Sequence, residues 1–367
     1  MKVNRAYRYE LNPNVQQRIL LTKHAGAARF AYNWGLARRI ELYQQTGKTT
    51  NAIEQHRELN SLKKTEYPWL YEVSKCAPQE ALRDLDRAFA NFFRGLKEGR
   101  HAGFPRFRKK GRDDRFRLTG SIRVVGRAVR LPRLGRIRLK EEPQVQGRVL
   151  SATVSREADR WYVSLTVEVD LPDPDPVAGP AVGVDVGLCH FATIVGDDGT
   201  VATIEAPRPL ERSLRRLRRR QRQHSRKRKG SKNRRKSALR LARLHRRVRN
   251  IRRDFLHQLT TRLAKTKSVI VVEDLNVSGL LQNPYLARHV ADSGWGEFRR
   301  MLAYKCMWYG SRLVVANRYD PSSKTCSACG HVLEALPLDV RVWDCPACGA
   351  HHDRDVNAAR NLLAMAR

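Results

Sequence analysis

The chain has 367 residues, of which 72 are Lys or Arg and 36 are Asp or Glu, giving a formal net charge of +36. This excess indicates a polyanionic partner, and the length allows two or three domains. No apolar run is long enough to span a bilayer, and the N-terminus lacks a signal-peptide core, so we expect an intracellular protein.

The N-terminal part predicts one strand followed by helices. Residues 3–11 alternate as a strand and stop at the turn signal Asn12-Pro13. Two later stretches, 20–36 and 77–96, carry apolar residues at a density that predicts buried helix faces, with a break at Glu66-Tyr-Pro-Trp between them.

A basic loop with two aromatic residues follows at 103–112. The alternation of phenylalanine with basic residues suits stacking on bases while phosphates are neutralised. A solvated loop anchored by its two phenylalanines explains the same pattern. The candidate nucleic-acid-binding residues are Phe104, Arg106, Phe107, Arg108 and Lys109.

From residue 115 to 169 the pattern predicts strands, many of which alternate apolar residues with arginine. One sheet face is therefore expected to be core and the other cationic. We expect the first strand to join these strands, which makes the helical segment an insertion. The proline-rich segment 171–180 reads as a stiff linker and a domain boundary.

The first acid of interest, Asp185, lies in the strand-like run Gly183-Val-Asp-Val-Gly187. An aspartate among β-forming residues is costly to bury without a partner or metal. The flanking glycines would let another backbone or a phosphodiester approach closely. The alternative is that Asp185 merely ends a strand and caps a turn. Residues 190–204 then read as a hairpin, giving three consecutive antiparallel strands.

The segment 211–253 contains 22 Lys or Arg and a single acid. Apolar residues persist at helical spacing and are interrupted at Gly230-Ser231, which predicts two basic amphipathic helices joined by a turn. A solvated charged face is the usual explanation of a charge run, but this excess of arginine favours nucleic acid. The candidate contacts are Arg218, Arg219, Arg222 and Arg226.

Two further acids follow. Residues 268–274 predict a buried strand whose end presents Glu273, and Asp355 falls in the first turn of a C-terminal helix, where the helix dipole favours an anion. With Asp185 they would form a three-carboxylate cluster at one sheet edge, which two Mg²⁺ or Mn²⁺ ions would neutralise. Two-metal phosphodiester cleavage needs such a cluster. Asp274 and Asp353 lie nearby in the sequence, and we expect each to support these ligands or to cap a helix.

Four cysteines form two Cys-x-x-Cys-Gly pairs separated by 15 residues. This spacing predicts a tetrahedral, structural zinc site; redox-active or free thiols are the alternative. Because four thiolates close the site, we expect the nearby His331, His351 and His352 to be surface residues. The proposed zinc ligands are Cys326, Cys329, Cys345 and Cys348.

Several motifs together resemble the TnpB family of transposon-encoded, RNA-guided DNA nucleases, which is related to the type V CRISPR effectors. Together with the helical stretch Gly26-Ala-Ala-Arg-Phe-Ala-Tyr-Asn-Trp and the loop Gly103-Phe-Pro-Arg-Phe, which also resemble the family, the motifs span nearly the whole chain. They are Gly183-Val-Asp-Val-Gly, Val271-Val-Glu-Asp-Leu-Asn, Trp295-Gly-Glu-Phe-Arg-Arg-Met-Leu-Ala-Tyr-Lys, Pro321-Ser-Ser-Lys-Thr-Cys-Ser-Ala-Cys-Gly and Asp353-Arg-Asp-Val-Asn-Ala-Ala-Arg-Asn.

The resemblance implies a fold that combines α/β, β-barrel and helical parts. It implies a RuvC-like, RNase H-like nuclease domain at 180–324 and 350–367 with an inserted four-cysteine zinc ribbon at 325–349. It also implies a wedge β-barrel at 1–12 and 114–178, and a helical recognition domain at 13–113.

The implied function is RNA-guided DNA endonuclease of a transposable element. The family's catalytic acids fall on Asp185, Glu273 and Asp355, none of which is substituted. The implied partners are a guide RNA from the transposon end and double-stranded target DNA carrying a short adjacent motif. We expect one protein chain per complex, in the prokaryotic cytoplasm and at the nucleoid. A nuclease-silent RNA-guided regulator and a DNA-strand transferase are the alternatives.

Overall fold

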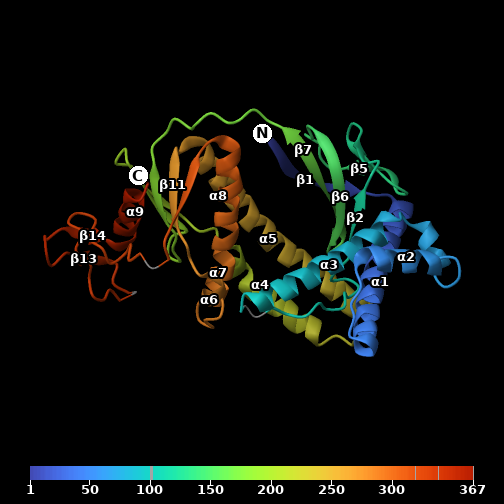
Figure 1. The fold of residues 1–367 in the computed structure, drawn as a ribbon. Coiled ribbons are helices and arrows are strands. Elements are labelled where there is room, and N and C mark those ends of the chain that lie inside the picture. Colours follow the sequence, from blue (N-terminus) through green and yellow to red (C-terminus); the bar gives the residue numbers. More distant parts are fainter. Residues whose placement is uncertain (100–101, 319, 338, 367) are drawn as a thin grey trace. The chain divides into compact units, whose positions relative to one another are not determined.

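The computed structural model describes residues 1–99, 102–318, 320–337 and 339–366 (Figure 1). The chain divides into two units, Met1–Leu171 and Pro172–Arg367, which meet within the proline-rich segment. Each unit has its own sheet.

The first unit is built on a seven-stranded antiparallel sheet with the order β2-β6-β7-β1-β5-β4-β3. The N-terminal strand β1 (Lys2–Asn12) pairs with β7 (Arg160–Asp170), from Lys2 opposite Asp170 to Leu11 opposite Trp161. The expectation that the first strand joins the later ones is thus confirmed. Because β2 and β3 stand at the two ends of this order, closure into a barrel stays a prediction. The other strands are β2 (Arg115–Thr119), β3 (Arg123–Val124), β4 (Ala128–Leu131), β5 (Gly135–Leu139) and β6 (Arg148–Glu157).

Alternation along these strands separates a core face from a cationic face. In β5, Ile137 and Leu139 are buried while Arg136 and Arg138 are exposed. In β7 every second residue from Trp161 to Val169 is buried. Because side chains of a strand alternate between the two faces, this pattern confirms the expected apolar core face, and in β5 the residues opposite it are arginines.

The helices of the first unit follow β1 directly. They are α1 (Val15–Thr46), α2 (Ala52–Leu62), the short 3₁₀ helix η1 (Pro68–Glu72) and α3 (Cys76–Lys97). Asn14 and Gln17 form a reciprocal capping box that starts α1. Gly35 lets α1 approach α3, because a Cβ there would lie 2.6 Å from Leu82 Cδ2.

The second unit is an α/β layer structure on a five-stranded sheet with the order β10-β9-β8-β11-β12. The strands are β8 (Val182–Asp185), β9 (Ala192–Gly196), β10 (Val201–Ile204), β11 (Val269–Glu273) and β12 (Arg312–Ala316). Strands β8, β9 and β10 are consecutive and antiparallel, as the sequence predicted, while β8, β11 and β12 run parallel.

Helices cover both faces of this sheet. Ile270 and Val272 of β11 face a core shared with α5 (Lys232–Thr266) and α8 (Trp295–Tyr309), where Phe191 packs edge-on against Phe255 and Phe298. Val271 faces the opposite side, where Leu362 of the C-terminal helix α9 (Arg354–Ala364) covers it. The continuous apolar run of β11 is therefore explained by burial on two faces.

The remaining elements of the second unit are short or strongly basic. They are α4 (Pro209–Ser225), α6 (Val277–Leu280), α7 (Ala287–Ser293), β13 (Val342–Asp344) and β14 (His351–Asp353). Strands β13 and β14 pair as an antiparallel hairpin just before α9. Every helix within the described ranges is too short or too polar to cross a membrane.

A buried histidine joins α1 to the segment before α3. His24 is fully buried; its Nδ1 lies 2.8 Å from the Leu20 carbonyl oxygen, and its Nε2 accepts a hydrogen bond of 3.0 Å from the Ser74 backbone N–H. This arrangement requires a neutral ring with the proton on Nδ1. Burial lowers the pKa of His24 below its usual 6.5, although the Leu20 carbonyl acts in the opposite direction.

This histidine should make the free energy of unfolding depend on pH. The folded pKa lies below the unfolded value, so the stability is complete above about pH 6.5 and falls as the pH drops, because the unfolded chain takes up the proton first. Urea unfolding should show a lower stability at pH 5.5 than at pH 7.5, and His24→Gln should reduce this difference. The exposed His245→Gln serves as the control. Equal pH dependence in wild type and His24→Gln would contradict the assignment.

Candidate functional site

Three carboxylates come together at one edge of the second sheet. Asp185 ends β8 and Glu273 ends β11, and these strands are parallel neighbours, so their carboxyl ends meet at the same edge. Asp355 lies in the first turn of α9, which packs on both strands. All three side chains are half-buried. The structure therefore brings together the three acids that the sequence selected, while their catalytic role stays a prediction.

A glycine makes this arrangement possible. A Cβ added at Gly183 would lie 2.0 Å from the Ala359 carbonyl oxygen and 2.6 Å from the Leu363 nitrogen. The strand and helix backbones are thus in direct contact, which only glycine allows. Of the two uses that the sequence left open for this glycine, the structure shows the approach of another backbone.

The three carboxylates act on one another electrostatically. Burial raises the pKa of Asp185 well above its usual 3.8, and the neighbouring Glu273 and Asp355 raise it further, while Arg354 and Arg341 act in the opposite direction. Carboxylates that oppose one another's ionisation in this way would be neutralised by a divalent cation. The donor set therefore fits hard metal ions such as Mg²⁺ or Mn²⁺.

Glu273 is held by a residue that the sequence did not single out. Ser322 Oγ donates a hydrogen bond to Glu273 Oε1, and Ser322 itself is buried. Asn361 of α9 donates to the Ser322 carbonyl at 2.7 Å, and Asn357 donates to the Thr325 carbonyl at 2.7 Å. The two asparagines are four residues apart, which places them on one face of the helix. This spacing is the feature of the sequence that indicates that they act together.

A second unforeseen contact is made by Arg341, which precedes β13. Its Nη1 lies 3.4 Å from Asp355 Oδ1, and its Nη2 lies 3.3 Å from the Cys189 sulfur. The guanidinium thus supplies a positive charge beside the acidic cluster. Arg341 lies in the segment between the two cysteine pairs, so the segment that carries the cysteines also contacts the candidate active site.

The other two acids have separate roles. Asp353 is the N-cap of α9, where its side chain accepts a hydrogen bond of 2.9 Å from the Val356 N–H, as expected for a capping residue. Asp274 forms ion pairs with Arg299 and Arg318. The Arg299 hydrogen bond is the largest cause of a lowered pKa of Asp274.

The four paired cysteines form a cluster whose sulfur atoms all lie within 4.8 Å of one another. The two knuckles repeat the same geometry: the Gly330 N–H donates to the Cys326 carbonyl and the Gly349 N–H donates to the Cys345 carbonyl, at 2.9 and 2.8 Å. Both glycines have positive φ, 79° and 71°. Four sulfurs in a closed group fit one tetrahedral metal ion.

His352 differs from the expectation that it lies at the surface. Its side chain is buried, its Nε2 lies 3.0 Å from the Cys326 sulfur, and its ring contacts Trp343 with centroids 4.7 Å apart. Folding of the β13–β14 hairpin places it beneath the cysteines. His352 therefore contacts the four-sulfur group without being one of its members.

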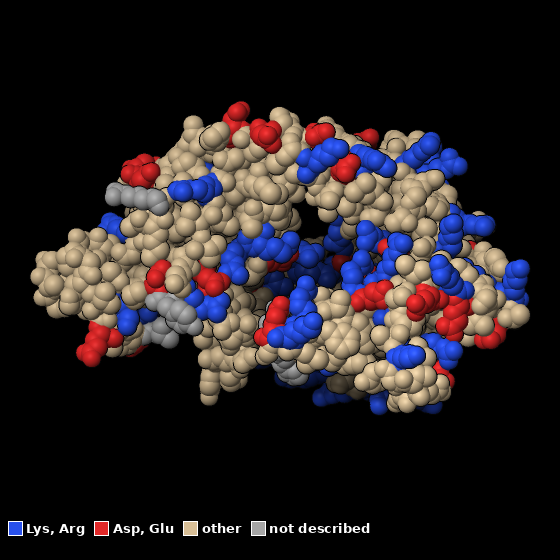
Figure 2. All heavy atoms as spheres, in the orientation of Figure 1, with Lys and Arg blue, Asp and Glu red and all other residues tan. Residues whose placement is uncertain are grey.

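The basic segment folds into the two helices that the sequence predicted. Gly230 has φ of 82° in the turn, and Ser231 caps α5 by accepting from the Arg234 N–H. Arg218, Arg219, Arg222 and Arg226 are all exposed. Figure 2 shows Lys and Arg covering more of the visible face than Asp and Glu, as the net charge requires. At the start of α4, the buried Asp292 accepts hydrogen bonds from the Leu210 and Glu211 N–H groups.

The loop at 103–109 has mixed exposure. Phe104 is 47% exposed and packs edge-on against Phe89 and Phe92, and Phe107 is 51% exposed. Arg106 and Lys109 are exposed. Arg108 is largely buried: its guanidinium lies 3.8 Å from the Tyr32 ring centroid and 3.0 Å from Asp84. Arg108 is therefore engaged within the unit, whereas Phe107, Arg106 and Lys109 present free surface.

Comparison with known proteins gives three family-model matches and close relatives. The matching models are described as "Probable transposase" (residues 164–284), "Cas12f1-like, TNB domain" (295–362) and "Helix-turn-helix domain" (1–48). The "Putative RNA-guided DNA endonuclease" of Streptomyces pristinaespiralis is 40% identical, covering 99% of this chain and 89% of that protein. The "Putative RNA-guided DNA endonuclease InsQ" of Escherichia coli is 37% identical, covering 99% and 92%.

Among solved structures, a Cas12f1–sgRNA–target DNA complex matches with a TM-score of 0.39 and 17% identity, covering 98% of each chain. The family assignment rests on the sequence relatives, which match from end to end and whose likeness spans the strands and helix that carry the three acids. The chain belongs to the TnpB family.

Proposed function

We propose that this protein is an RNA-guided DNA endonuclease of a transposable element. The observation that carries the proposal is the convergence of Asp185, Glu273 and Asp355 at one sheet edge. Full-length relatives described as RNA-guided DNA endonucleases support it. The retention of all three acids argues against a nuclease-silent regulator. The proposed partners are a guide RNA from the transposon end and double-stranded DNA with a short adjacent motif.

The domain assignment is part of the same proposal. The second unit would be the RuvC-like nuclease domain, with residues 325–349 as its zinc ribbon. The sheet of the first unit would be the wedge domain, and its helices 13–113 the recognition domain. The α/β layers, the cysteine cluster and the insertion of the helices between β1 and β2 support this layout.

The three acids are the proposed ligands of two Mg²⁺ or Mn²⁺ ions. When bound, such a pair activates water and stabilises the leaving oxygen of the phosphodiester. The chain itself orients the ligands: Ser322 holds one oxygen of Glu273, the α9 backbone fixes Asp355 beside β8, and Arg341 supplies positive charge. Hydrolysis breaks the bond to the 3′ oxygen and leaves a 5′ phosphate.

Replacing any one of the three acids with alanine should abolish guided plasmid cleavage while RNA and DNA binding persist. The reason is that the ligands of a metal pair act as a unit. The matched control is Asp353→Asn, because asparagine caps a helix as well as aspartate does, and cleavage should remain within about 10–100-fold of wild type. Cleavage by Asp355→Ala together with loss of cleavage in Asp353→Asn would contradict the assignment of Asp355 as the third metal ligand. Cleavage by all of the variants would contradict the proposed nuclease activity.

A second measurement tests the cluster without relying on activity. In metal-free protein, Asp185→Asn should raise the melting temperature, since it removes a buried charge that its neighbours repel. Added Mg²⁺ should stabilise wild type more than this variant, because a ligand that binds only the folded state raises stability. A larger Mg²⁺ effect in Asp185→Asn than in wild type would contradict the metal assignment.

We also propose that the cysteine cluster holds one structural zinc ion. Cys329→Ser or Cys348→Ser should release about one zinc per chain and lower the stability of the RNA complex, because a closed four-thiolate site contributes directly to folding. Elemental analysis of purified protein measures this, with Cys76→Ser, outside the cluster, as the control. Well-folded, active protein without zinc would refute the proposal.

The exposed face of α4 is proposed to hold nucleic acid by charge rather than by reading bases. Replacing Arg218, Arg219, Arg222 and Arg226 with glutamine should weaken binding equally on unrelated sequences. It should also flatten the salt dependence, since each lost phosphate contact removes roughly one released counterion. Binding titrations between low and moderate salt measure both effects. A changed sequence preference with an unchanged salt slope would be the contrary result.

A further inference from the structure

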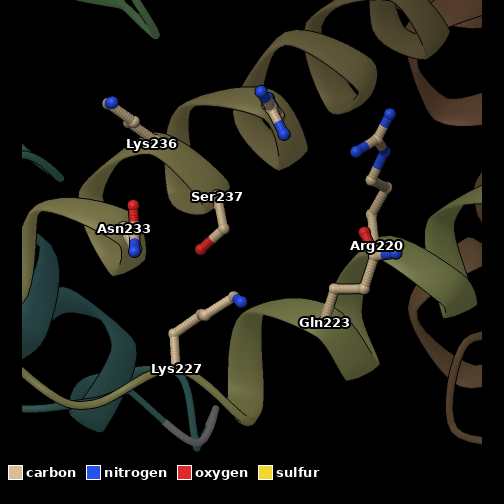
Figure 3. Close-up of a pocket in the computed structure, with 7 residues that line it drawn as sticks. Arg220, Gln223, Lys227, Asn233, Lys236 and Ser237 are labelled. Atoms are coloured by element: carbon tan, nitrogen blue, oxygen red, sulfur yellow. The ribbon is translucent and has the colours of Figure 1, made fainter.

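A pocket of about 490 Å³ lies between α4 and α5 on the side of the turn that joins them. We call it the helix-pair pocket; its volume falls in the range of about 300–1,000 Å³ typical of ligand sites. Figure 3 shows Lys227 and Ser237 pointing toward each other across the space between the two helices. The residues that line the pocket are Arg220, Gln223, Lys227, Asn233, Lys236, Ser237 and Arg240.

The charge of this pocket calls for an anion. Four of its seven lining residues are cations, and no lining residue is acidic. The sole acid between residues 211 and 253 is Glu211, at the opposite end of α4. Like charges around one pocket repel each other, so an anion placed among them removes an unfavourable interaction.

Hydrogen bonds already join the two helices beside the pocket. Arg234 Nη1 donates to the Lys227 carbonyl at 2.6 Å, and Ser231 caps the start of α5. His224 of α4 lies 2.8 Å from Ser237 Oγ, which in turn donates to the Arg234 carbonyl. These bonds tie the two helices together beside the turn, so the site needs little reorganisation to bind a ligand.

The uncharged lining residues distinguish this pocket from the outer face of α4. Gln223 and Asn233 are exposed amides from opposite sides of the pocket. An amide both donates and accepts hydrogen bonds, whereas lysine and arginine only donate. A phosphate needs donors alone. A ribose 2′-hydroxyl donates and accepts, and it is the group by which proteins distinguish RNA from DNA.

We propose that the helix-pair pocket binds a backbone phosphate of RNA together with the adjoining 2′-hydroxyl, and thereby favours RNA over DNA. Arg220, Lys227, Lys236 and Arg240 would meet the phosphate, and Gln223 and Asn233 the hydroxyl. The inference rests on the proposed function in that the bound RNA would be the guide. The helix-pair pocket would thus be a ribose-recognising site, separate from the charged outer face of α4.

The test measures the affinity of the full-length protein for three oligonucleotides of one sequence over a series of salt concentrations. The three are the RNA, the DNA and the 2′-O-methyl RNA. Wild type should prefer RNA over DNA by about 3–10-fold, the effect of one or two hydrogen bonds, and 2′-O-methylation should reduce this preference. The double variant Gln223→Leu, Asn233→Leu should lose the preference with an unchanged salt slope. Lys227→Gln should weaken both ligands and lower the slope.

The matched control is Arg218→Gln with Arg219→Gln on the outer face, which should weaken RNA and DNA alike and keep their ratio. Circular dichroism verifies that each variant is folded. Equal affinity of wild type for RNA and DNA, or a preference that survives in the double variant, would overturn the inference. Guided cleavage is assayed separately: RNA preference without cleavage would refute the proposed function alone, and cleavage without RNA preference would refute this inference alone.

Discussion

The close contact between β8 and α9 is the constraint on which the candidate active site depends. Gly183 places the strand backbone directly against the helix backbone, and any side chain there would collide with the Ala359 carbonyl. This contact sets Asp355 beside Asp185, although 170 positions separate them in the sequence. The price of the arrangement is electrostatic, since three half-buried carboxylates repel one another, and a divalent cation is the partner that would offset that repulsion.

The same helix organises the neighbouring elements. Asn357 and Asn361 hold the segment that begins with Ser322, and Ser322 in turn holds Glu273. The first cysteine pair follows that segment directly. Arg341, which lies between the two cysteine pairs in the sequence, contacts Asp355. Loss of the cysteine cluster should therefore disturb the acidic site through these contacts.

The basic helices contribute charge in two different settings. The outer arginines of α4 are exposed and suit any polyanion, while the helix-pair pocket combines cations with amides between two helices that hydrogen bonds join. Because charge alone gives affinity without selectivity, the neutral residues between the cations are the ones that we propose distinguish RNA from DNA. The two groups can be tested independently since they consist of different residues.

The sequence by itself determined the features that depend on local pattern. Runs of β-forming and apolar residues predicted the strands ending in Asp185 and Glu273. The first-turn position predicted the helix of Asp355, the turn at Gly230-Ser231 predicted two basic helices, and spacing predicted the cysteine cluster. Only the tertiary structure decided that Arg108 stacks on Tyr32, that His352 is buried, and that Ser322 and Arg341 reach the acids. Some of these contacts join residues that are tens of positions apart or more, and others depend on how a hairpin folds over its cysteines. Local periodicity carries no information about such pairings, because packing alone selects them.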